Sequence, residues 1–472
     1  MSTKTLSIKP SRKLLLAIPP LLLFTSVAYS AGFALIENSA SGMGNAFAGA
    51  AAVAEDSSTI WFNPAGMTYL GENNPSKSQV SSAVHIISAK TDFTDKGSSA
   101  PASLLSTIDG KKNVSERVTS AVPNLYYMRK IKPRLNFGIS INAPFGSTTK
   151  YDEDWIGRYQ ATETEMKTVN INPSLSWKAN DKLSLGGGIS AQYIHVSLGK
   201  SLDSAAACRK VALASGSSAT LDACNTSYPE ASQVAKDSQV IVEGDDISFG
   251  YNLGLLYQPT TRTRIGATYR SQVKHNLEGD ISFELDPTLK AIGKGLEAKG
   301  INTFKDRNIE AVTDLPETIA LSVAHKVNNK LELLGDVTWT GWSSFPELLI
   351  TDAKTGADVT RTPENWTDVT RVSLGANFQY SDKLVLRTGI ALDEEPIPSA
   401  KTRTPRIPGN DRKWLSFGAG YKMNKKTKFD VGYSHLFLDE TPIDNTDDAG
   451  YAVKGLYDSN VNIFSAQVNY NF

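Results

Sequence analysis

Residue types that perform catalysis are sparse in this sequence. None of the five histidines is followed by glutamate, so the H-E-x-x-H pattern of zinc hydrolases is missing. The G-x-S-x-G pattern of α/β-hydrolases is missing as well. Gly199-Lys200-Ser201 is similar to the end of a phosphate-binding loop, but Ile194 stands where that loop requires its first glycine. We therefore predict no catalytic residue, no metal site and no cofactor, and we expect a protein that is not an enzyme.

Two arginines are candidates for binding a carboxylate. Arg270 and Arg387 occupy polar positions in segments where polar and apolar residues alternate, next to Tyr269 and Leu386. A guanidinium binds a carboxylate through two parallel hydrogen bonds. Because a buried arginine is costly unless it is paired, each could instead form a structural ion pair with an acid such as Asp393.

The two cysteines, Cys208 and Cys224, fall in a polar insertion rich in alanine and serine. In an exported protein, an even pair of this kind indicates a disulfide that closes a surface loop. A zinc site is the weaker alternative, because the insertion contains no histidine.

The first thirty residues have the features of an export signal. Four basic residues precede an apolar run from Leu14 to Val27, and Ala28-Tyr29-Ser30 offers small residues for cleavage. A membrane anchor is the alternative, but this run is too short to cross about 30 Å of hydrocarbon and contains two prolines. We predict a signal peptide over residues 1–30 and a mature chain outside the cytoplasm.

The overall charge excludes one class of partner. The chain has 49 basic and 49 acidic residues, so the basic footprint of a nucleic-acid-binding protein is missing and we expect no such partner. Beyond the signal, no run approaches the eighteen or so apolar residues of a membrane-spanning helix.

The elements that position these residues are strands. From Ile247 to Tyr257, large apolar residues alternate with serine, glycine and asparagine, and the same alternation returns over 384–393 and 415–423. A strand with lipid outside and a polar interior requires this pattern. A soluble β-sandwich also alternates, but strands of about 9–11 residues suit a bilayer crossing.

Short and long connections alternate along the chain. Short, polar turns are expected at 128–133, 178–182, 259–264, 327–330, 381–383 and 424–428, whereas the longest connection covers about 199–245. This spacing predicts an all-β fold, a transmembrane antiparallel β-barrel of about fourteen strands. Closure into a barrel also removes exposed strand edges.

The stretch from Ala31 to Leu70 strongly resembles the N-terminal hatch of the outer-membrane long-chain fatty-acid transporter family (the FadL type), above all in Asn63-Pro64-Ala65. The resemblance continues in family order through 142–146, 155–159, 252–257, 268–271, 341–343, 387–391 and 407–412. The C-terminal segment ends on Phe472, which resembles the terminal signature of outer-membrane proteins. The resemblance implies a hatch domain over residues 31–73 inside the lumen of a barrel over residues 74–472.

The resemblance also implies a function. Members of the family carry hydrophobic molecules passively, so we expect uptake of long-chain fatty acids, with aromatic hydrocarbons of the toluene type as an alternative cargo. The expected location is the bacterial outer membrane, multi-pass, with membrane lipid as a neighbour, no energy-coupling partner and a monomeric state. A general porin and a barrel hydrolase remain as other classes.

Two sets of residues are expected to control passage. In the hatch, Phe33 and Leu35 could occupy an apolar pocket until cargo displaces them, or could only anchor the hatch. In the wall, Pro144, Phe145 and Gly146 should interrupt a strand, because proline cannot donate a ladder hydrogen bond and glycine weakens a strand. The resemblance implies a lateral exit at this kink; alternatively, the strand simply leaves the membrane there.

The two longest loops are candidates for a capture surface, near Leu202–Leu221 and Leu285–Phe304. The second loop contains apolar residues at helix-like spacing: Leu289, Ile292, Leu296 and Ile301. A loop helix packed on the rim of the barrel is the equally weighted alternative.

Overall fold

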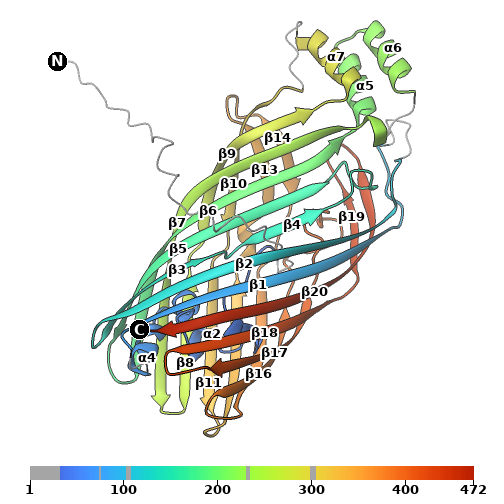
Figure 1. Ribbon diagram of the computed structural model, residues 1–472. Helices are drawn as coiled ribbons and strands as arrows, with labels where there is room; N and C mark the ends of the chain where they lie inside the picture. The colour runs from blue at the N-terminus through green and yellow to red at the C-terminus, as the bar shows by residue number, and fades with distance from the viewer. Residues whose placement is uncertain (1–31, 74–75, 102–107, 230–233, 298–303) are drawn as a thin grey trace, which may run out of the picture.

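The computed structural model describes residues 32–73, 76–101, 108–229, 234–297 and 304–472. Its strands form one closed antiparallel barrel of fourteen spans, which confirms the predicted fold class (Figure 1). The barrel closes where β1 (Ser78–Asp95) pairs with β20 (Ala452–Asn471) on one side and with β2 (Asn113–Lys132) on the other. The predicted signal peptide lies outside the described residues.

Eight spans are single strands and six are interrupted. Besides β1, β2 and β20, the single strands are β5 (Glu163–Lys178), β6 (Leu183–Leu202), β7 (Ser238–Thr260), β16 (Leu384–Asp393) and β17 (Arg412–Lys422). The interrupted spans are β3–β4 (Leu135–Asn142, Gly146–Lys150), β8–β9 (Thr263–Arg270, Val273–Glu284), β10–β11 (Arg307–Leu315, Thr318–Lys326), β12–β13 (Leu331–Thr340, Glu347–Asp352), β14–β15 (Asp358–Pro363, Val369–Gln379) and β18–β19 (Thr427–Leu438, Thr441–Thr446).

The predicted alternation sets which side chains face outward. On β7, Phe249 is 70% exposed and Leu253 is 55% exposed, whereas Asn252 between them is fully buried. The same division places Ile390 outside and Arg387 inside on β16. Apolar groups therefore face lipid and polar groups face the lumen, as an outer-membrane barrel requires.

The six short turns overlap the predicted ranges, all at the end of the barrel that also holds the C-terminus (Figure 1). The first range is misplaced, because β2 continues to Lys132 and the turn covers only residues 133 and 134. This is the periplasmic end, because short turns of such barrels face the periplasm. The strands at the other end are longer than expected: β6 and β7 have 20 and 23 residues and pair throughout from Leu202–Ser238 downward. The expected connection at 199–245 therefore shrinks, because the ladder continues well beyond the thickness of the membrane.

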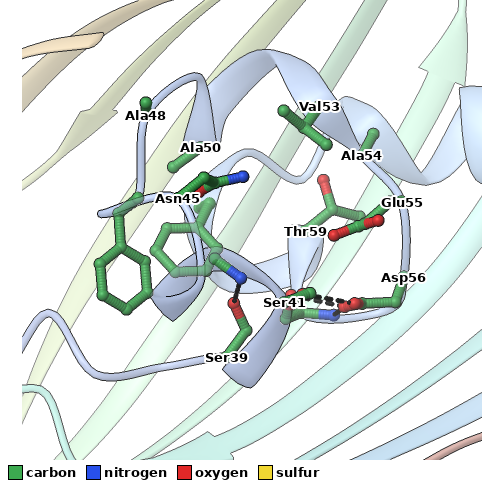
Figure 2. A pocket seen from close by; sticks show the side chains of 14 residues that line it. Ser39, Ser41, Asn45, Ala48, Ala50, Val53, Ala54, Glu55, Asp56 and Thr59 are labelled. Atoms are coloured by element: carbon green, nitrogen blue, oxygen red, sulfur yellow. Dashed lines mark hydrogen bonds between the residues drawn. The ribbon is translucent and has the colours of Figure 1, made fainter. Parts of the chain in front are cut away.

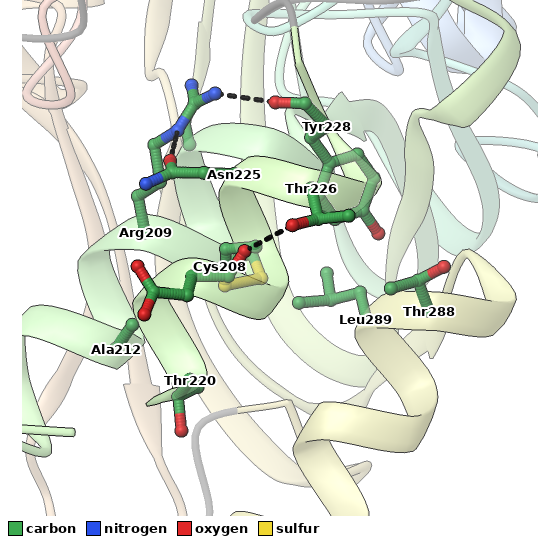
Figure 3. The surroundings of a disulfide bond; sticks show 12 residues. Cys208, Arg209, Ala212, Thr220, Asn225, Thr226, Tyr228, Thr288 and Leu289 are labelled. Atoms are coloured by element: carbon green, nitrogen blue, oxygen red, sulfur yellow. Dashed lines mark hydrogen bonds between the residues drawn. A yellow bond between two sulfur atoms is a disulfide. The ribbon is translucent and has the colours of Figure 1, made fainter. Parts of the chain in front are cut away.

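Three helices form a cap at the extracellular end, and a disulfide joins two of them. These are α5 (Ser204–Ala214), α6 (Ser218–Ser227) and α7 (Pro287–Glu297). The predicted bond between Cys208 and Cys224 links α5 to α6, and Leu289 of α7 packs beside it, fully buried (Figure 3). The apolar face of α7 thus packs on the neighbouring loop. The side chains of Leu296 and Ile301 lie outside the described residues.

Four short helices before β1 occupy the periplasmic half of the barrel interior (Figure 1). They are α1 (Ala40–Met43), α2 (Ala50–Val53), α3 (Thr59–Phe62) and α4 (Gly66–Asn73). Small residues let this segment, hereafter the hatch, approach the wall closely: a Cβ on Gly389 would lie 2.2 Å from the carbonyl oxygen of Asn45. Within the described part of the chain, no helix combines the length and apolarity that a membrane crossing needs.

Candidate functional site

An apolar cavity lies between the hatch and the extracellular half of the wall. Counted with the gaps between its lining atoms and the solvent at its open mouth it spans about 780 Å³, of which about 80 Å³ is open to a water-sized molecule. Its apolar lining comes from the hatch, the strand extensions and two loops: Phe33, Met166, Val196, Leu198, Val242, Leu277, Ile309, Ala311, Phe345, Leu348, Ile350 and Ile407. The space suits a molecule with a long apolar part, because burying apolar surface is favourable by about 25 cal/mol per Å².

The hatch residue Phe33 forms one wall of this cavity and is held in an aromatic cage. Its ring centroid lies 4.7 Å from that of Trp342, 5.3 Å from that of Trp366 and 5.6 Å from that of Phe345. Gly32 has a φ of +62°, and a Cβ there would lie 2.5 Å from Trp366, so only glycine lets the chain pass beside the indoles.

The same hatch segment is hydrogen-bonded to the interruption between β3 and β4. The amide of Leu35 donates to the carbonyl oxygen of Pro144 at 2.8 Å, and the amide of Gly146 donates to that of Phe33 at 2.9 Å. Phe145 lies between them, 6.2 Å from the ring of Phe33. The structure thus brings together two sets of predicted residues that are more than a hundred positions apart in the chain.

The barrel wall is incompletely paired beside this interruption. The ladder between β2 and β3 ends at Leu125 and Ile141, and among the described residues β4 pairs only with β5. From Asn124 towards the extracellular end, β2 therefore has no ladder partner on the side of β4. The side chain of Asn124 instead donates to the carbonyl oxygen of Glu37 in the hatch at 2.9 Å.

Two ionisable side chains from loops line the otherwise apolar cavity, Arg406 and Glu364. Burial lowers the pKa of Arg406 to about 10, which leaves the guanidinium charged at neutral pH. Burial raises the pKa of Glu364 to about 8, so this carboxyl group is mainly neutral at pH 7. Arg406 donates to neutral oxygens only, those of Gln160, Glu163, Thr164 and Gly199. Sequence reasoning missed Arg406, although it directly precedes a stretch that carries the family resemblance.

Neither Arg270 nor Arg387 lines this cavity. Arg387 pairs with Glu55 of the hatch at 3.0 Å and with Asp430 at 2.9 Å, and its side chain is fully buried. Arg270 stacks on the indole of Trp61 at 3.5 Å and donates to that residue's carbonyl oxygen. Both arginines thus connect the barrel wall to the hatch. The acid suggested by sequence, Asp393, lies 3.5 Å from Arg412 instead.

The triplet Asn63-Pro64-Ala65 anchors the hatch to β7. The amide of Asn63 donates to the carbonyl oxygen of Leu255 at 2.9 Å and to that of Ala51 at 2.7 Å, and its own oxygen accepts from the amide of Ala65. On the wall, a Cβ added to Gly254 would lie 2.1 Å from that side-chain oxygen, so a glycine at this position of β7 leaves the space that Asn63 needs.

The hatch also contains a small pocket of its own, lined by both polar and apolar side chains. Figure 2 shows Asp56 and Ser41 side by side at its edge, where Ser41 donates to Asp56 at 2.8 Å. Asp56 further accepts from Ser58 and from Gln467 of β20. Its carboxylate is satisfied by these partners, so the pocket contributes to the packing of the hatch.

Comparisons with known proteins agree with this geometry. The sequence profile of the family described as outer membrane protein transport protein (OMPP1/FadL/TodX) matches residues 21–472. A long-chain fatty acid transport protein of Escherichia coli O6:H1 is 31% identical over 444 residues, which cover 92% of each chain. Outer membrane protein P1 of Haemophilus influenzae is 29% identical over 428 residues, covering 88% of each chain.

Solved structures of related outer-membrane proteins have a similar fold. A Pseudomonas aeruginosa FadL homologue, 25% identical, covers 94% of this chain and all of its own with a TM-score of 0.81. The Pseudomonas putida toluene transporter TodX is 16% identical and shares the fold, with a TM-score of 0.59 over 87% of this chain and 92% of its own.

Proposed function

Since the chain belongs to the outer membrane protein transport family (OMPP1/FadL/TodX), and is therefore an outer-membrane channel for hydrophobic compounds rather than an enzyme, we propose that its cargo is a long-chain fatty acid. The apolar cavity is the binding site. Displacement of the first hatch residues opens the route out, and cargo leaves sideways into the membrane.

One observation carries this proposal: Phe33 is both a wall of the cavity and the hydrogen-bonded neighbour of the interruption between β3 and β4. An apolar chain that enters the cavity competes with Phe33 for the aromatic cage. If Phe33 leaves, the hydrogen bonds that tie residues 33–35 to Pro144 and Gly146 break with it. Binding and opening are therefore coupled through one short segment.

The charge of Arg406 supports a carboxylate-bearing cargo. A guanidinium inside an apolar site is costly unless an anion pairs with it, and carboxylates are its preferred partners. Among the described residues it has no ion pair, and Glu364 beside it is mainly neutral at pH 7. Aromatic hydrocarbons are the second candidate, supported by the fold shared with TodX, but they carry no carboxylate to pair with this cation.

The unpaired side of β2 supports lateral release. Apolar cargo that leaves between β2 and β4 reaches lipid directly and avoids the aqueous periplasm. The alternative, in which the strand only leaves the membrane at Pro144, does not explain why hatch residues fill the position of the missing ladder.

Phe33→Asp tests the proposal. A charged side chain does not remain in the aromatic cage, so cargo no longer has to offset the roughly 3 kcal/mol of Phe33 burial, and we expect about 100-fold tighter fatty-acid binding because the binding-competent state becomes dominant. Phe33→Leu, which keeps an apolar plug, should bind nearly as the wild type does. Tryptophan fluorescence of the assembled barrel, titrated with fatty acid, measures the affinity. Unchanged affinity in Phe33→Asp would mean that these residues only anchor the hatch.

A further inference from the structure

A second cavity opens at the opposite end of the barrel, between the hatch and the periplasmic turns. It encloses about 1050 Å³ including its open mouth, and we call it the vestibule. Its lining consists almost entirely of charged and amide side chains: Glu55, Lys326, Asn328, Asn329, Lys330, Glu332, Asn377, Gln379, Lys383, Lys422 and Lys428, with Leu331, Val385 and Gly420. The transport route proposed above does not use it.

The vestibule carries an excess of positive charge. Its two acids are already paired with cations of the wall, Glu55 with Arg387 and Lys428, and Glu332 with Arg264. Lys326, Lys330, Lys383 and Lys422 form no ion pair within the part of the chain that the structure describes. Four ammonium groups therefore face a shared space without a counter-charge from the described residues.

These lysines point into the barrel mouth and away from the surrounding lipid. Lys422 follows Gly420 by two positions on β17, and Lys383, in the turn directly before β16, precedes Val385 by two; all four residues line the vestibule. Since side chains two apart on a strand share a face, the lysines belong to the inner face. The outward neighbour Tyr421 is 48% exposed on the lipid side. The headgroups of the surrounding lipid lie outside the barrel wall and therefore cannot contact these inward-facing lysines.

The structure also indicates which anion this wall accepts. At the inner end of the vestibule, the carboxylate of Glu55 lies 3.0 Å from Arg387 and 3.3 Å from Lys428. A fatty acid does not suit the rest of the space, because Leu331 and Val385 are its only large apolar residues. The amides of Asn328, Asn329, Asn377 and Gln379 can instead pair with a peptide backbone.

We propose that the vestibule is a docking site for an acidic segment of a periplasmic polypeptide, rich in aspartate or glutamate. Carboxylates of that segment pair with the four lysines that form no ion pair among the described residues. The side-chain amides of Asn328, Asn329, Asn377 and Gln379 bind its backbone. The site faces the periplasm, because the lysines lie at the short turns and are exposed there. Charge complementarity of this type governs specificity and association rate.

A labelled oligoglutamate peptide, titrated into the purified full-length protein and followed by fluorescence anisotropy, tests the proposal. The triple variant Lys326→Gln, Lys383→Gln and Lys422→Gln should bind the peptide at least about tenfold more weakly, because it removes three of the four unpaired ammonium groups. The matched control is Lys132→Gln, Lys182→Gln and Arg262→Gln. It removes the same charge from other periplasmic turns and should bind within about twofold of the wild type.

Two results would overturn the proposal. An equal loss in both triple variants would mean that the peptide responds only to the general basicity of the rim. Displacement of the peptide by inorganic phosphate, at an ionic strength where chloride has no effect, would mean that the vestibule is a site for small anions. Retained peptide binding in the control, with loss in the vestibule variant, would support it.

Discussion

Replacement of Arg406 by glutamine is the sharpest test of the cargo. The guanidinium lines the cavity, is charged at neutral pH and donates only to neutral oxygens. A hydrogen bond to a charged group contributes about 1.5–3 kcal/mol, so Arg406→Gln should weaken fatty-acid binding about 10- to 150-fold. An uncharged cargo of the same length, such as the methyl ester, should lose little affinity.

The assay compares the two cargoes in one variant. Arg406 also ties down loop residues, since it donates to carbonyl oxygens of Gln160 and Gly199, so its replacement can disturb the loops. Such a disturbance weakens both cargoes, whereas loss of a carboxylate partner weakens only the acid. The ratio of the two dissociation constants, measured by isothermal titration, therefore isolates the effect of charge.

Arg403→Gln provides the matched control. Arg403 lies in the same loop and is 5% exposed, but it donates to the carbonyl oxygens of Gly409 and Pro442 and does not line the cavity. Its replacement should leave the ratio between acid and ester unchanged. Equal losses for acid and ester in Arg406→Gln would refute the carboxylate assignment and favour a hydrocarbon cargo.

The remaining predictions concern pH, the hatch and the exit. Since burial raises the pKa of Glu364 to about 8, its carboxylate forms as pH rises from 7 to 9, repels the cargo and lowers fatty-acid affinity; a titration series on Glu364→Gln should show no such slope. Arg387→Gln should expose the hatch to protease by removing one of the two cations that hold Glu55, yet leave the preference for acid over hydrocarbon unchanged; selective loss of the acid would make Arg387 the clamp. Pro144→Thr with Gly146→Val should block uptake into cells while the purified protein still binds cargo, whereas wild-type uptake would exclude lateral release.

The sequence predicts the barrel well because its signal is local. Alternation along β7 requires only neighbouring residues, and the same holds for the short turns and for the disulfide between Cys208 and Cys224. The six interruptions of the spans are harder to predict, because few of them carry a clear signal in the sequence. Pro144 and Gly146 mark one of them, but the break between β8 and β9 contains only Ser271 and Gln272.

Residues of the site were harder to predict because they depend on contacts between distant parts of the chain. The alternation of polar and apolar residues along the strand placed Arg387 in the lumen correctly. It could not reveal that the guanidinium of Arg387 forms an ion pair with Glu55 of the hatch. Arg406 lies in a loop, where the alternation of polar and apolar residues does not predict which way a side chain points. Only the folding of that loop into the barrel, against Gln160 and Gly199, brings the guanidinium to the cavity.

The contacts of the hatch divide its tasks between two regions. Towards the periplasm, Asn63, Asp56 and Arg387 fix it through hydrogen bonds and ion pairs that an apolar molecule cannot replace. At the cavity, residues 33–35 are held by the aromatic cage and by two hydrogen bonds to the interrupted strand. This arrangement favours release of the first residues while the rest of the hatch stays in place.

The free energy needed to displace residues 33–35 also sets a minimum length for the cargo. Burial of Phe33 contributes about 3 kcal/mol. The two hydrogen bonds of residues 33–35, one accepted by Phe33 and one donated by Leu35, contribute together at most about 3 kcal/mol, so displacement costs about 6 kcal/mol. Each methylene that enters the cavity returns about 0.8 kcal/mol, and about eight methylenes are needed to offset the displacement. A small aromatic hydrocarbon buries too little surface to reach this threshold, whereas a long acyl chain exceeds it. If the proposed route holds, the aromatic cage around Phe33 selects for cargo length at one end of the cavity, and Arg406 in the loops selects for a charged head group.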